Sequence, residues 1–368
     1  MSRPRTIATI LIVVVLVAGG FIWWNFLARR AIPPPPDGNS QIASAVVEGL
    51  EIPWELAFLS DGAILLTERP GRVRYIDSSG ALRADPLPGV EGVAAVGEGG
   101  LLGLALHPGF DYNRWIYLYH TYRAGSGLAN RVVRYTLGNG LTLSGYTVII
   151  DGIPGGNVHN GGRIKFGPDG LLYIGTGDSG IDTLAQDLNS LAGKILRLND
   201  DGSIPSNNPF PNSAVYSYGH RNVQGLAWDG FGQLWATEHG SNNFDELNLI
   251  EAANNYGWPV VRGETTAPGM TGPKLHSGND TWAPSGLTFF QGSLYFTGLR
   301  GQSIFEYNLQ TGRLTRYLNG IFGRLRDIVN GPDGYLYVIT NNLDGRGIPL
   351  AGDDHLIRIN PARLAETA

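Results

Sequence analysis

A tight turn leads straight into a strand in the segment Asp169-Gly170-Leu171-Leu172-Tyr173. Asp and Gly favour the turn, and the apolar residues after it are typical of a short buried strand. The chain holds five more units in which an aromatic residue or Leu stands at the matching place: Asp61-Gly62-Ala63-Ile64-Leu65, Asn113-Arg114-Trp115-Ile116-Tyr117, Gly230-Phe231-Gly232-Gln233-Leu234-Trp235, Gly292-Ser293-Leu294-Tyr295 and Asp333-Gly334-Tyr335-Leu336-Tyr337.

The six units are spaced like the blades of a β-propeller. Their last residues are 52, 56, 62, 60 and 42 residues apart along the chain. One four-stranded blade takes roughly 40 to 50 residues, and the excess is expected to form loops. We therefore predict an all-β, six-bladed β-propeller whose loops gather at one end of a central channel, where we expect the functional site.

The composition agrees with this fold and excludes several classes of function. Only 16% of the residues are charged, whereas 53 Gly and 22 Pro supply turns, so many short strands are expected. By length residues 41–368 could form two domains, but the repetition favours one closed ring. The net charge of −5 provides no broad basic surface, which argues against a nucleic-acid partner. The chain has no cysteine, which excludes disulfides, thiolate catalysis and thiolate metal sites.

Residues 1–30 are predicted to form a membrane anchor. The run Ile7–Leu27 contains 21 uncharged residues, which as a helix would span about 31 Å at ~1.5 Å per residue, enough to cross a bilayer. Two tryptophans near its end suit the membrane interface. The alternative is a cleaved secretory signal, whose apolar core is usually about 7 to 15 residues long. Residues 31–40, with four successive prolines, are expected to form a stiff linker.

A candidate base and its partner occur in the segment from Val158 to Asp178. His159 lies in a Gly-rich loop just before a strand, where its imidazole can face a pocket with little steric cover. Asp178 ends the following strand of the same probable hairpin, close enough to orient the imidazole and to favour its protonated form. Taken alone, a His in such a loop is more often a turn or packing residue, and an Asp in the place of Asp178 is more often a turn residue.

Polar groups gather in two further segments, residues 218–225 and 237–246. Arg221 and Asn222 are planar donors suited to gripping a carboxylate or a carbonyl oxygen. Near Gly240 the backbone carbonyls could face a hard cation such as calcium. The structural alternatives are an ion pair between blades for the arginine and an ordinary loop for the glycine.

Arginines recur at the expected blade ends. Arg324 and Arg326 stand two residues apart, so in a strand their side chains point to the same side. Arg300 lies in a similar loop one blade earlier. Together with Arg221 they could line a pocket for an anionic ligand, although arginines scattered over the surface are the alternative.

The ordered segments resemble those of the soluble pyrroloquinoline quinone (PQQ)-dependent aldose sugar dehydrogenases, the glucose/sorbosone dehydrogenase family. The resemblance implies a six-bladed propeller that uses PQQ and calcium. It is carried by eight motifs: Pro53 to Phe58, Gly99 to Pro108, His159 to Asp178, Gly193 to Arg197, Gly219 to Gly225, Glu246 to Pro259, Thr281 to Ser285 and Arg324 to Gly334.

The resemblance implies roles for the reacting groups. His159 would take the proton of the anomeric hydroxyl of an aldose while hydride leaves for the quinone, and Asp178 would orient this base. Arg221 and Asn222 would hydrogen-bond the quinone oxygens. The reaction would convert the aldose to a lactone.

The resemblance also implies the binding groups. Four side chains would hold the cofactor: Thr281, Arg324, Arg326 and Arg300, the last at a position where the family commonly has Lys. The carbonyl oxygens of Gly240 and Ser241 would bind calcium, and some relatives have a further, structural calcium at the positions of Glu246 and Tyr256.

On the substrate side the sequence departs from the family. Glu98 stands where glucose-oxidising relatives have a Gln that touches the sugar, and Val158 replaces an Asp beside the base. We therefore expect a more open aldose site rather than one selective for glucose.

The resemblance further implies a propeller on the outer, periplasmic side of the inner membrane. Electrons would pass to a quinone or a small redox carrier. Two other functions stay open at this point: a calcium-dependent sugar lactonase, which needs several carboxylates around one metal, and a non-catalytic ligand-binding propeller, which would not need the base.

Overall fold

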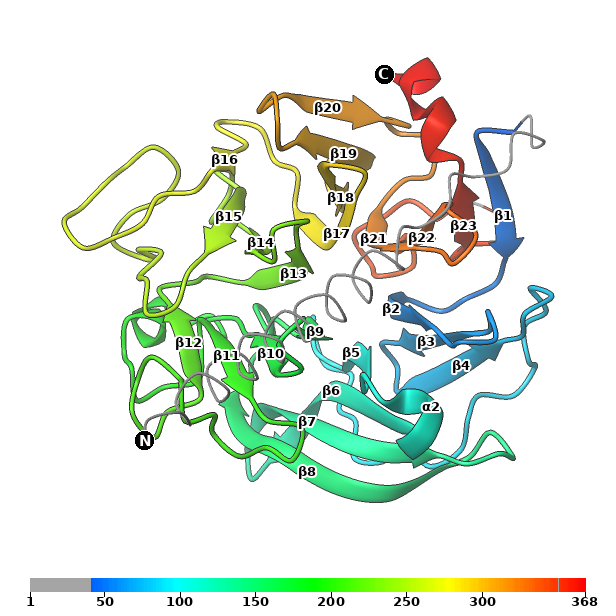
Figure 1. The fold of residues 1–368 in the computed structure, drawn as a ribbon, viewed down its shortest axis with the longest axis horizontal. Coiled ribbons are helices and arrows are strands. Elements are labelled where there is room, and N and C mark those ends of the chain that lie inside the picture. The colour runs from blue at the N-terminus through cyan, green and yellow to red at the C-terminus, as the bar shows by residue number, and fades with distance from the viewer. Residues whose placement is uncertain (1–40, 350) are drawn as a thin grey trace, which may run out of the picture.

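The described residues form six antiparallel sheets arranged as blades around a central axis (Figure 1). The structure is a computed structural model that describes residues 41–349 and 351–368. The predicted anchor over residues 1–30 and the linker over residues 31–40 lie outside the described part. The prediction of an all-β, six-bladed propeller is confirmed.

Each blade begins with an inner strand beside the axis and continues outward. The first three blades are β2 (Pro53–Phe58), β3 (Ile64–Glu68) and β4 (Arg72–Ile76); β5 (Leu101–Leu106), β6 (Trp115–Ala124), β7 (Gly127–Leu137) and β8 (Leu143–Pro154); and β9 (Ile164–Phe166), β10 (Leu172–Gly175), β11 (Lys194–Leu198) and β12 (Val215–Tyr218). The other three are β13 (Val223–Trp228), β14 (Leu234–Glu238), β15 (Glu246–Ile250) and β16 (Leu275–His276); β17 (Pro284–Phe290), β18 (Ser293–Gly298), β19 (Ser303–Asn308) and β20 (Leu314–Tyr317); and β21 (Leu325–Asn330), β22 (Leu336–Thr340), β23 (Leu356–Ile359) and β1 (Ala43–Val47).

The ring is closed by its two ends. Strand β1 pairs with β23 in antiparallel register, Ala43 opposite Ile359, so the last blade contains the first strand of the described chain. Neighbouring inner strands contact one another around the axis, and β21 contacts β2. The first blade has three regular strands, and single bridges from Val73 to Leu87 and from Ile76 to Leu82 stand in place of a fourth.

The six repeated units supply the second strand of each blade, which explains their spacing. In three blades an Asp in the turn is bonded by the ring of the aromatic residue at the end of the unit. The pairs are Tyr173 Oη to Asp169 at 2.9 Å, Trp235 Nε1 to Asp229 at 2.9 Å and Tyr337 Oη to Asp333 at 3.0 Å. The Asp also accepts from the backbone of its own turn. In these three blades the sequence repeat is therefore a local hydrogen-bonded unit.

The core lies between adjacent blades, as separate apolar clusters. One cluster combines the fourth and fifth blades, where Phe296 and Phe305 stack at 4.9 Å between ring centroids and Trp282 packs on both. Burial of apolar area between sheets stabilises the ring by roughly 25 cal/mol per Å². This packing makes the inner strands a rigid frame for the loops at their ends.

A buried ion cluster ties three inner strands together along the axis. Arg163, directly before β9, contacts Glu55 of β2 at 2.9 Å and Asp327 of β21 at 3.0 Å, and all three side chains are buried. Burial raises the pKa of Glu55 to about 7, against the opposing charge of Arg163. Since Arg163 follows the loop that carries His159, the ion cluster anchors the end of that loop where it joins β9.

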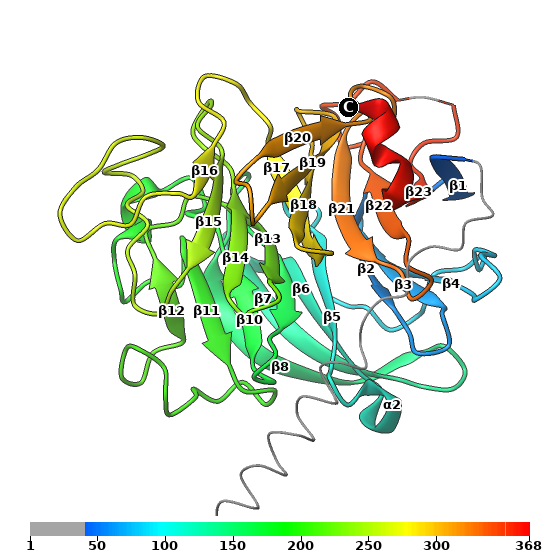
Figure 2. The ribbon, with the colours of Figure 1, turned by 45° about the horizontal axis from the view of Figure 1, so that its top comes forward.

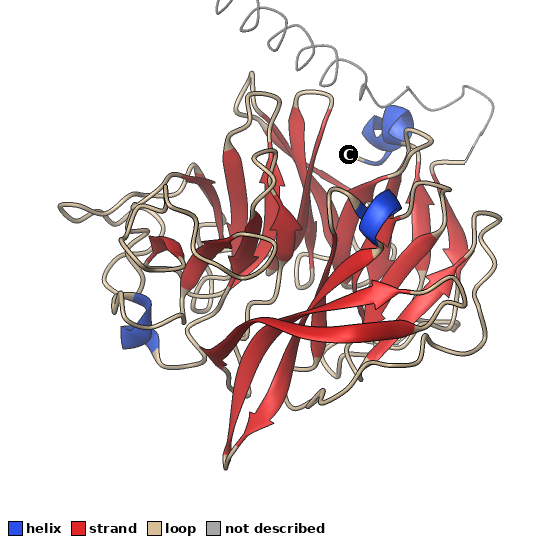
Figure 3. Ribbon diagram, turned by 60° about the horizontal axis from the view of Figure 1, so that its bottom comes forward, coloured by secondary structure: helices blue, strands red, loops and turns tan. Residues whose placement is uncertain are grey.

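Helices are short in the described chain, as the secondary-structure colours of Figure 3 show. They are α2 (Phe110–Asn113), η1 (Asp182–Ala185) and η2 (Pro361–Thr367). Helix η2 is capped by Asn360 and lies beside the last blade (Figure 2). Within the described residues no helix is long and apolar enough to cross a membrane. The predicted span Ile7–Leu27 lies outside this part of the chain.

Candidate active site

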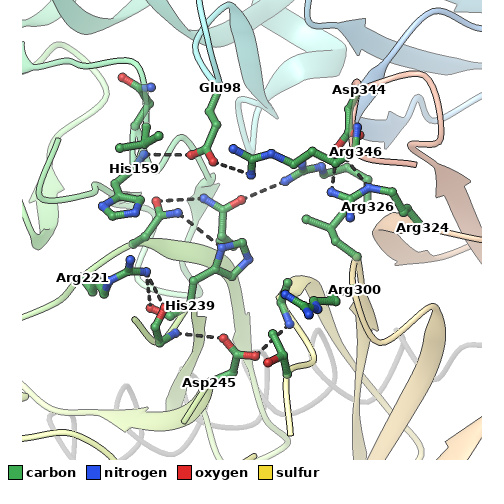
Figure 4. Close-up of a pocket in the computed structure, with 18 of the residues that line it drawn as sticks. Glu98, His159, Arg221, His239, Asp245, Arg300, Arg324, Arg326, Asp344 and Arg346 are labelled. Atoms are coloured by element: carbon green, nitrogen blue, oxygen red, sulfur yellow. Dashed lines mark hydrogen bonds and ion pairs between the residues drawn. The ribbon is translucent and has the colours of Figure 1, made fainter. Parts of the chain in front are cut away.

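A cavity of about 800 Å³ is lined by loops of all six blades at one end of the ring (Figure 4). Most of its residues precede the inner strands or follow the second strand of a blade, and Trp54, Gln224 and Arg326 stand second in inner strands, so the lining comes from one face of the propeller. The structure brings ten of the predicted site residues to this cavity: Glu98, His159, Arg221, Asn222, Gly240, Ser241, Thr281, Arg300, Arg324 and Arg326.

The predicted pair of His159 and Asp178 is present. Nδ1 of His159 lies 2.7 Å from Oδ1 of Asp178, which also accepts from the backbone of Gly180, while Oδ2 accepts from Trp258 Nε1 at 2.8 Å. Burial raises the pKa of Asp178, but the hydrogen bond and charge of His159 outweigh it, so this pKa lies below its ordinary value. Asp178 is therefore a buried carboxylate that orients a partly exposed imidazole.

The loop that carries His159 depends on glycines. A β-carbon on Gly177 would lie 1.9 Å from the carbonyl oxygen of His159, and one on Gly161 would lie 2.5 Å from that of Gly175. Side chains would push this loop off the end of β10. His159 itself has φ of 55°, a left-handed conformation that residues other than glycine seldom adopt.

Arg221 and Asn222 lie beside the base. Asn222 Oδ1 accepts from the backbone of Gly161 at 3.0 Å, which ties it to the loop of the base. Arg221 donates to the carbonyl of Gly240, and its guanidinium lies 5.2 Å from the ring centroid of Trp258. Because no carboxylate in the described chain forms an ion pair with the Arg221 side chain, its charge remains available to a ligand.

The arginines opposite His159 differ in their partners. Arg324 forms an ion pair with Asp344 at 2.7 Å. Arg326 instead donates to three neutral side chains, Gln224 at 2.9 Å, Asn341 at 3.2 Å and Ser285 at 3.4 Å. Burial, together with the neighbouring arginines, lowers the pKa of Arg326 to about 9, against the opposing charge of Asp344. Arg326 is therefore a partly buried cation with neutral hydrogen-bond partners.

The calcium predictions stay predictions. Gly240 and Ser241 line the cavity, and no cluster of three His, Asp or Glu side chains in the described residues is arranged to hold a metal. A cation here would depend on backbone carbonyls, each with two lone pairs, and on ligand oxygens. Glu246 and Tyr256 line a separate, smaller cavity behind Arg221.

Several lining residues were not predicted, namely Arg69, His239, Asp344 and Arg346. Two of them had a usable signal. Arg69 follows β3 directly and His239 follows β14 directly, so both stand just after a repeated strand. Since the second strands of all blades end on the same face, the residue after each repeat is a candidate for the cavity wall.

Comparisons with known proteins show what the chain is similar to. The profile of the Glucose / Sorbosone dehydrogenase family matches residues 50–356. Aldose sugar dehydrogenase YliI of Escherichia coli is 35% identical over 333 residues, covering 80% of this chain and 89% of its own. Quinoprotein glucose dehydrogenase B of Acinetobacter calcoaceticus is 36% identical over 250 residues, covering 59% of this chain and 52% of its own.

A solved structure extends the likeness to the whole ring. The PQQ-bound aldose sugar dehydrogenase of Streptomyces coelicolor is 41% identical and superimposes with a TM-score of 0.80, covering 89% of this chain and 99% of its own. With the family profile spanning nearly the entire described propeller, the chain belongs to the glucose/sorbosone dehydrogenase family.

Proposed function

We propose that this protein is a PQQ-dependent aldose dehydrogenase that oxidises the anomeric carbon of aldoses to lactones. The observation that carries the proposal is the pair of His159 and Asp178, whose imidazole faces a cavity walled on the other side by arginines. The named activities of the relatives in Escherichia coli, Acinetobacter and Streptomyces support it.

The cavity suits PQQ in size and charge. A volume of about 800 Å³ lies within the range of roughly 300 to 1,000 Å³ that is common for pockets of small ligands. PQQ carries three carboxylates, and five arginines besides Arg346 line the cavity: Arg69, Arg221, Arg300, Arg324 and Arg326. When bound, PQQ would supply an electrophilic quinone carbonyl that accepts hydride.

The residues of the chain supply the proton chemistry. We assign the proton of neutral His159 to Nδ1, since this atom lies 2.7 Å from the Asp178 carboxylate. Nε2 then keeps a lone pair with which it can take the proton of the anomeric hydroxyl. Asp178 stabilises the imidazolium that results, and Trp258 holds Asp178 in place.

The remaining predicted residues would bind the cofactor and polarise its quinone. Arg221 and Asn222 would donate to the quinone oxygens, and Thr281, Arg300, Arg324 and Arg326 would hold the carboxylates. Arg326 is assigned the larger share, because Asp344 already neutralises Arg324. Calcium would bind to the carbonyl oxygens of Gly240 and Ser241 together with the cofactor.

The proposal includes a location. The uncharged run Ile7–Leu27 motivates a membrane anchor with the propeller on the periplasmic side, where electrons would pass to a quinone or a small redox carrier. Fractionation of cells that express the full chain tests the anchor. Recovery in the soluble fraction with a cleaved N-terminus would contradict it.

Reconstitution tests the reaction. The purified protein is incubated with PQQ and calcium, and dye reduction is followed with a panel of aldoses. We expect activity that depends on both additions and extends over several aldoses. Hydrolysis of sugar lactones without PQQ would instead support a lactonase, and saturable sugar binding without turnover would support a binding protein.

A further inference from the structure

Glu98 uses both carboxylate oxygens to hold parts of the protein (Figure 4). Oε2 accepts the backbone N–H of His159 at 2.8 Å, and Oε1 lies 2.7 Å from Nη1 of Arg346. Each oxygen of the side chain predicted to touch the sugar is therefore engaged with a neighbouring loop. This arrangement suggests a different task for Glu98.

The backbone of His159 is the part that needs support. Its φ of 55° is unfavourable for a residue with a β-carbon, so neighbouring contacts must maintain it. Glu98 contributes twice, because its own N–H also donates to the carbonyl of Asn157 at 2.8 Å. The two segments approach so closely that a β-carbon on Gly97 would lie 2.2 Å from that carbonyl oxygen.

The contact between Glu98 and His159 is a charge-assisted hydrogen bond. Burial raises the pKa of Glu98, but the hydrogen bond from His159 and the charge of Arg346 outweigh it and lower this pKa below its ordinary value. Glu98 is therefore ionised at neutral pH. Hydrogen bonds to a charged acceptor are stronger than those between neutral groups.

Arg346 reaches Glu98 from another blade. It lies in the loop between β22 and β23, in the sixth blade, whereas Glu98 precedes β5 of the second blade. Asp344 fixes this loop, since Oδ1 accepts the backbone N–H of Arg346 at 2.8 Å and Oδ2 binds Arg324 at 2.7 Å. The Arg346 side chain is 59% exposed, so only its tip is held.

We propose that Glu98 is a positioning residue that holds the backbone of His159 in its left-handed conformation, and that Arg346 of the sixth blade orients Glu98. This inference rests on the proposed function. The expected role of Glu98 is then to position the catalytic base His159 rather than to bind the sugar.

Kinetics separate the two roles. Glu98→Ala removes both contacts, whereas Glu98→Gln keeps an oxygen for the His159 N–H and loses the charge that pairs with Arg346. We expect kcat to fall about 10- to 100-fold in Glu98→Ala with KM within about threefold of the wild type, and to fall less than about fivefold in Glu98→Gln. Arg346→Ala should resemble Glu98→Gln and add nothing to Glu98→Ala. A raised KM with unchanged kcat in both Glu98 variants would overturn the proposal in favour of direct sugar contact.

A second measurement does not depend on turnover. Amide hydrogen exchange at His159 is followed by NMR in the full-length protein without PQQ, with the amide of Leu172 in the core as a reference. We expect exchange at His159 at least about tenfold faster in Glu98→Ala and nearly unchanged in Glu98→Gln. An unchanged rate in Glu98→Ala would refute the positioning role. If this pattern holds but the wild type oxidises no aldose with PQQ, the proposed function fails while the contact stands.

Discussion

Two histidine–carboxylate pairs in this propeller have nearly the same geometry and different surroundings. His159 binds Asp178 at 2.7 Å and His220 binds Glu238 at 2.8 Å, each through Nδ1. In the second pair Nε2 of His220 forms a hydrogen bond with Ser217 Oγ at 2.8 Å, and the imidazole of His220 stacks on the ring of Tyr256. Among the described residues no side chain binds Nε2 of His159, which faces the cavity.

The difference shows that a histidine paired with a carboxylate is not in itself a base. Ser217, His220 and Glu238 imitate the order of a hydrolytic triad, yet Ser217 and His220 are fully buried and line neither the large cavity nor the smaller one behind Arg221. The buried pair has a supporting task. Glu238 also accepts the backbone N–H of Arg221, so it fixes the loop that faces the ligand.

Removal of His159 is the strongest test of this comparison. In His159→Ala we expect kcat to fall about 10²- to 10⁴-fold, because a positioned base contributes that much, while the affinity for PQQ stays close to that of the wild type. Ser217→Ala is the matched control at the buried pair and should leave kcat within about twofold. Near-normal turnover in His159→Ala would reject the assigned base, and a large loss in Ser217→Ala would mean that the buried group takes part in the reaction.

Replacement of the two carboxylates should give unequal effects. Asp178→Asn removes the charge that stabilises the imidazolium and no longer enforces a proton on Nδ1, so kcat should fall about 100-fold. Glu238→Gln keeps an oxygen for the Arg221 N–H, and we expect kcat within about fivefold and a lower Tm. Steady-state kinetics and thermal melts distinguish these outcomes. Equal losses of kcat would contradict the separate roles of the two pairs.

The arginines differ in the same way, because one is ion-paired within the protein and another keeps its charge for a ligand. Arg326→Gln should weaken PQQ binding about 10- to 100-fold, as expected for the loss of a charged hydrogen bond, because its protein partners are neutral. Arg324→Gln should weaken binding less, since Asp344 already compensates that charge. Fluorescence titration of the protein with PQQ measures both constants. A larger effect at Arg324 would show that Asp344 moves away when the ligand binds.

The features that the sequence predicted are encoded within short stretches of chain. The six blades follow from a repeated turn and strand, and in three of them an Asp of the turn binds the aromatic residue of its own strand. His159 and Asp178 belong to neighbouring segments of one blade, so their contact follows from a hairpin. By contrast, Arg346 meets Glu98 and Trp258 meets Asp178 only because the ring brings distant loops together. No local sequence pattern predicts contacts of this kind.

Glu238 of the buried pair also makes the stability of the protein depend on pH. This is the smallest of the predicted effects. Glu246 lies opposite Glu238 in the register of β14 and β15, and burial together with the charge of Glu238 raises its pKa from an ordinary 4.5 to about 8. A raised pKa means that the folded state holds this proton more tightly than the unfolded chain. Its contribution to stability is therefore complete below about pH 4.5 and is lost as the pH rises through about 8.

Glu246→Gln removes this titration and keeps an oxygen for the backbone N–H of Gly263. In a chelating buffer at pH 8.5 we therefore expect its Tm to exceed that of the wild type by a few degrees, and at pH 4.5 the two proteins should melt alike. With calcium added at pH 8.5, the wild type should instead have the higher Tm if the ion binds at Glu246, because only the wild-type carboxylate binds calcium and is stabilised by it. Parallel pH profiles in the chelating buffer would mean that Glu246 is already ionised in the folded protein and that Glu238 tolerates its charge.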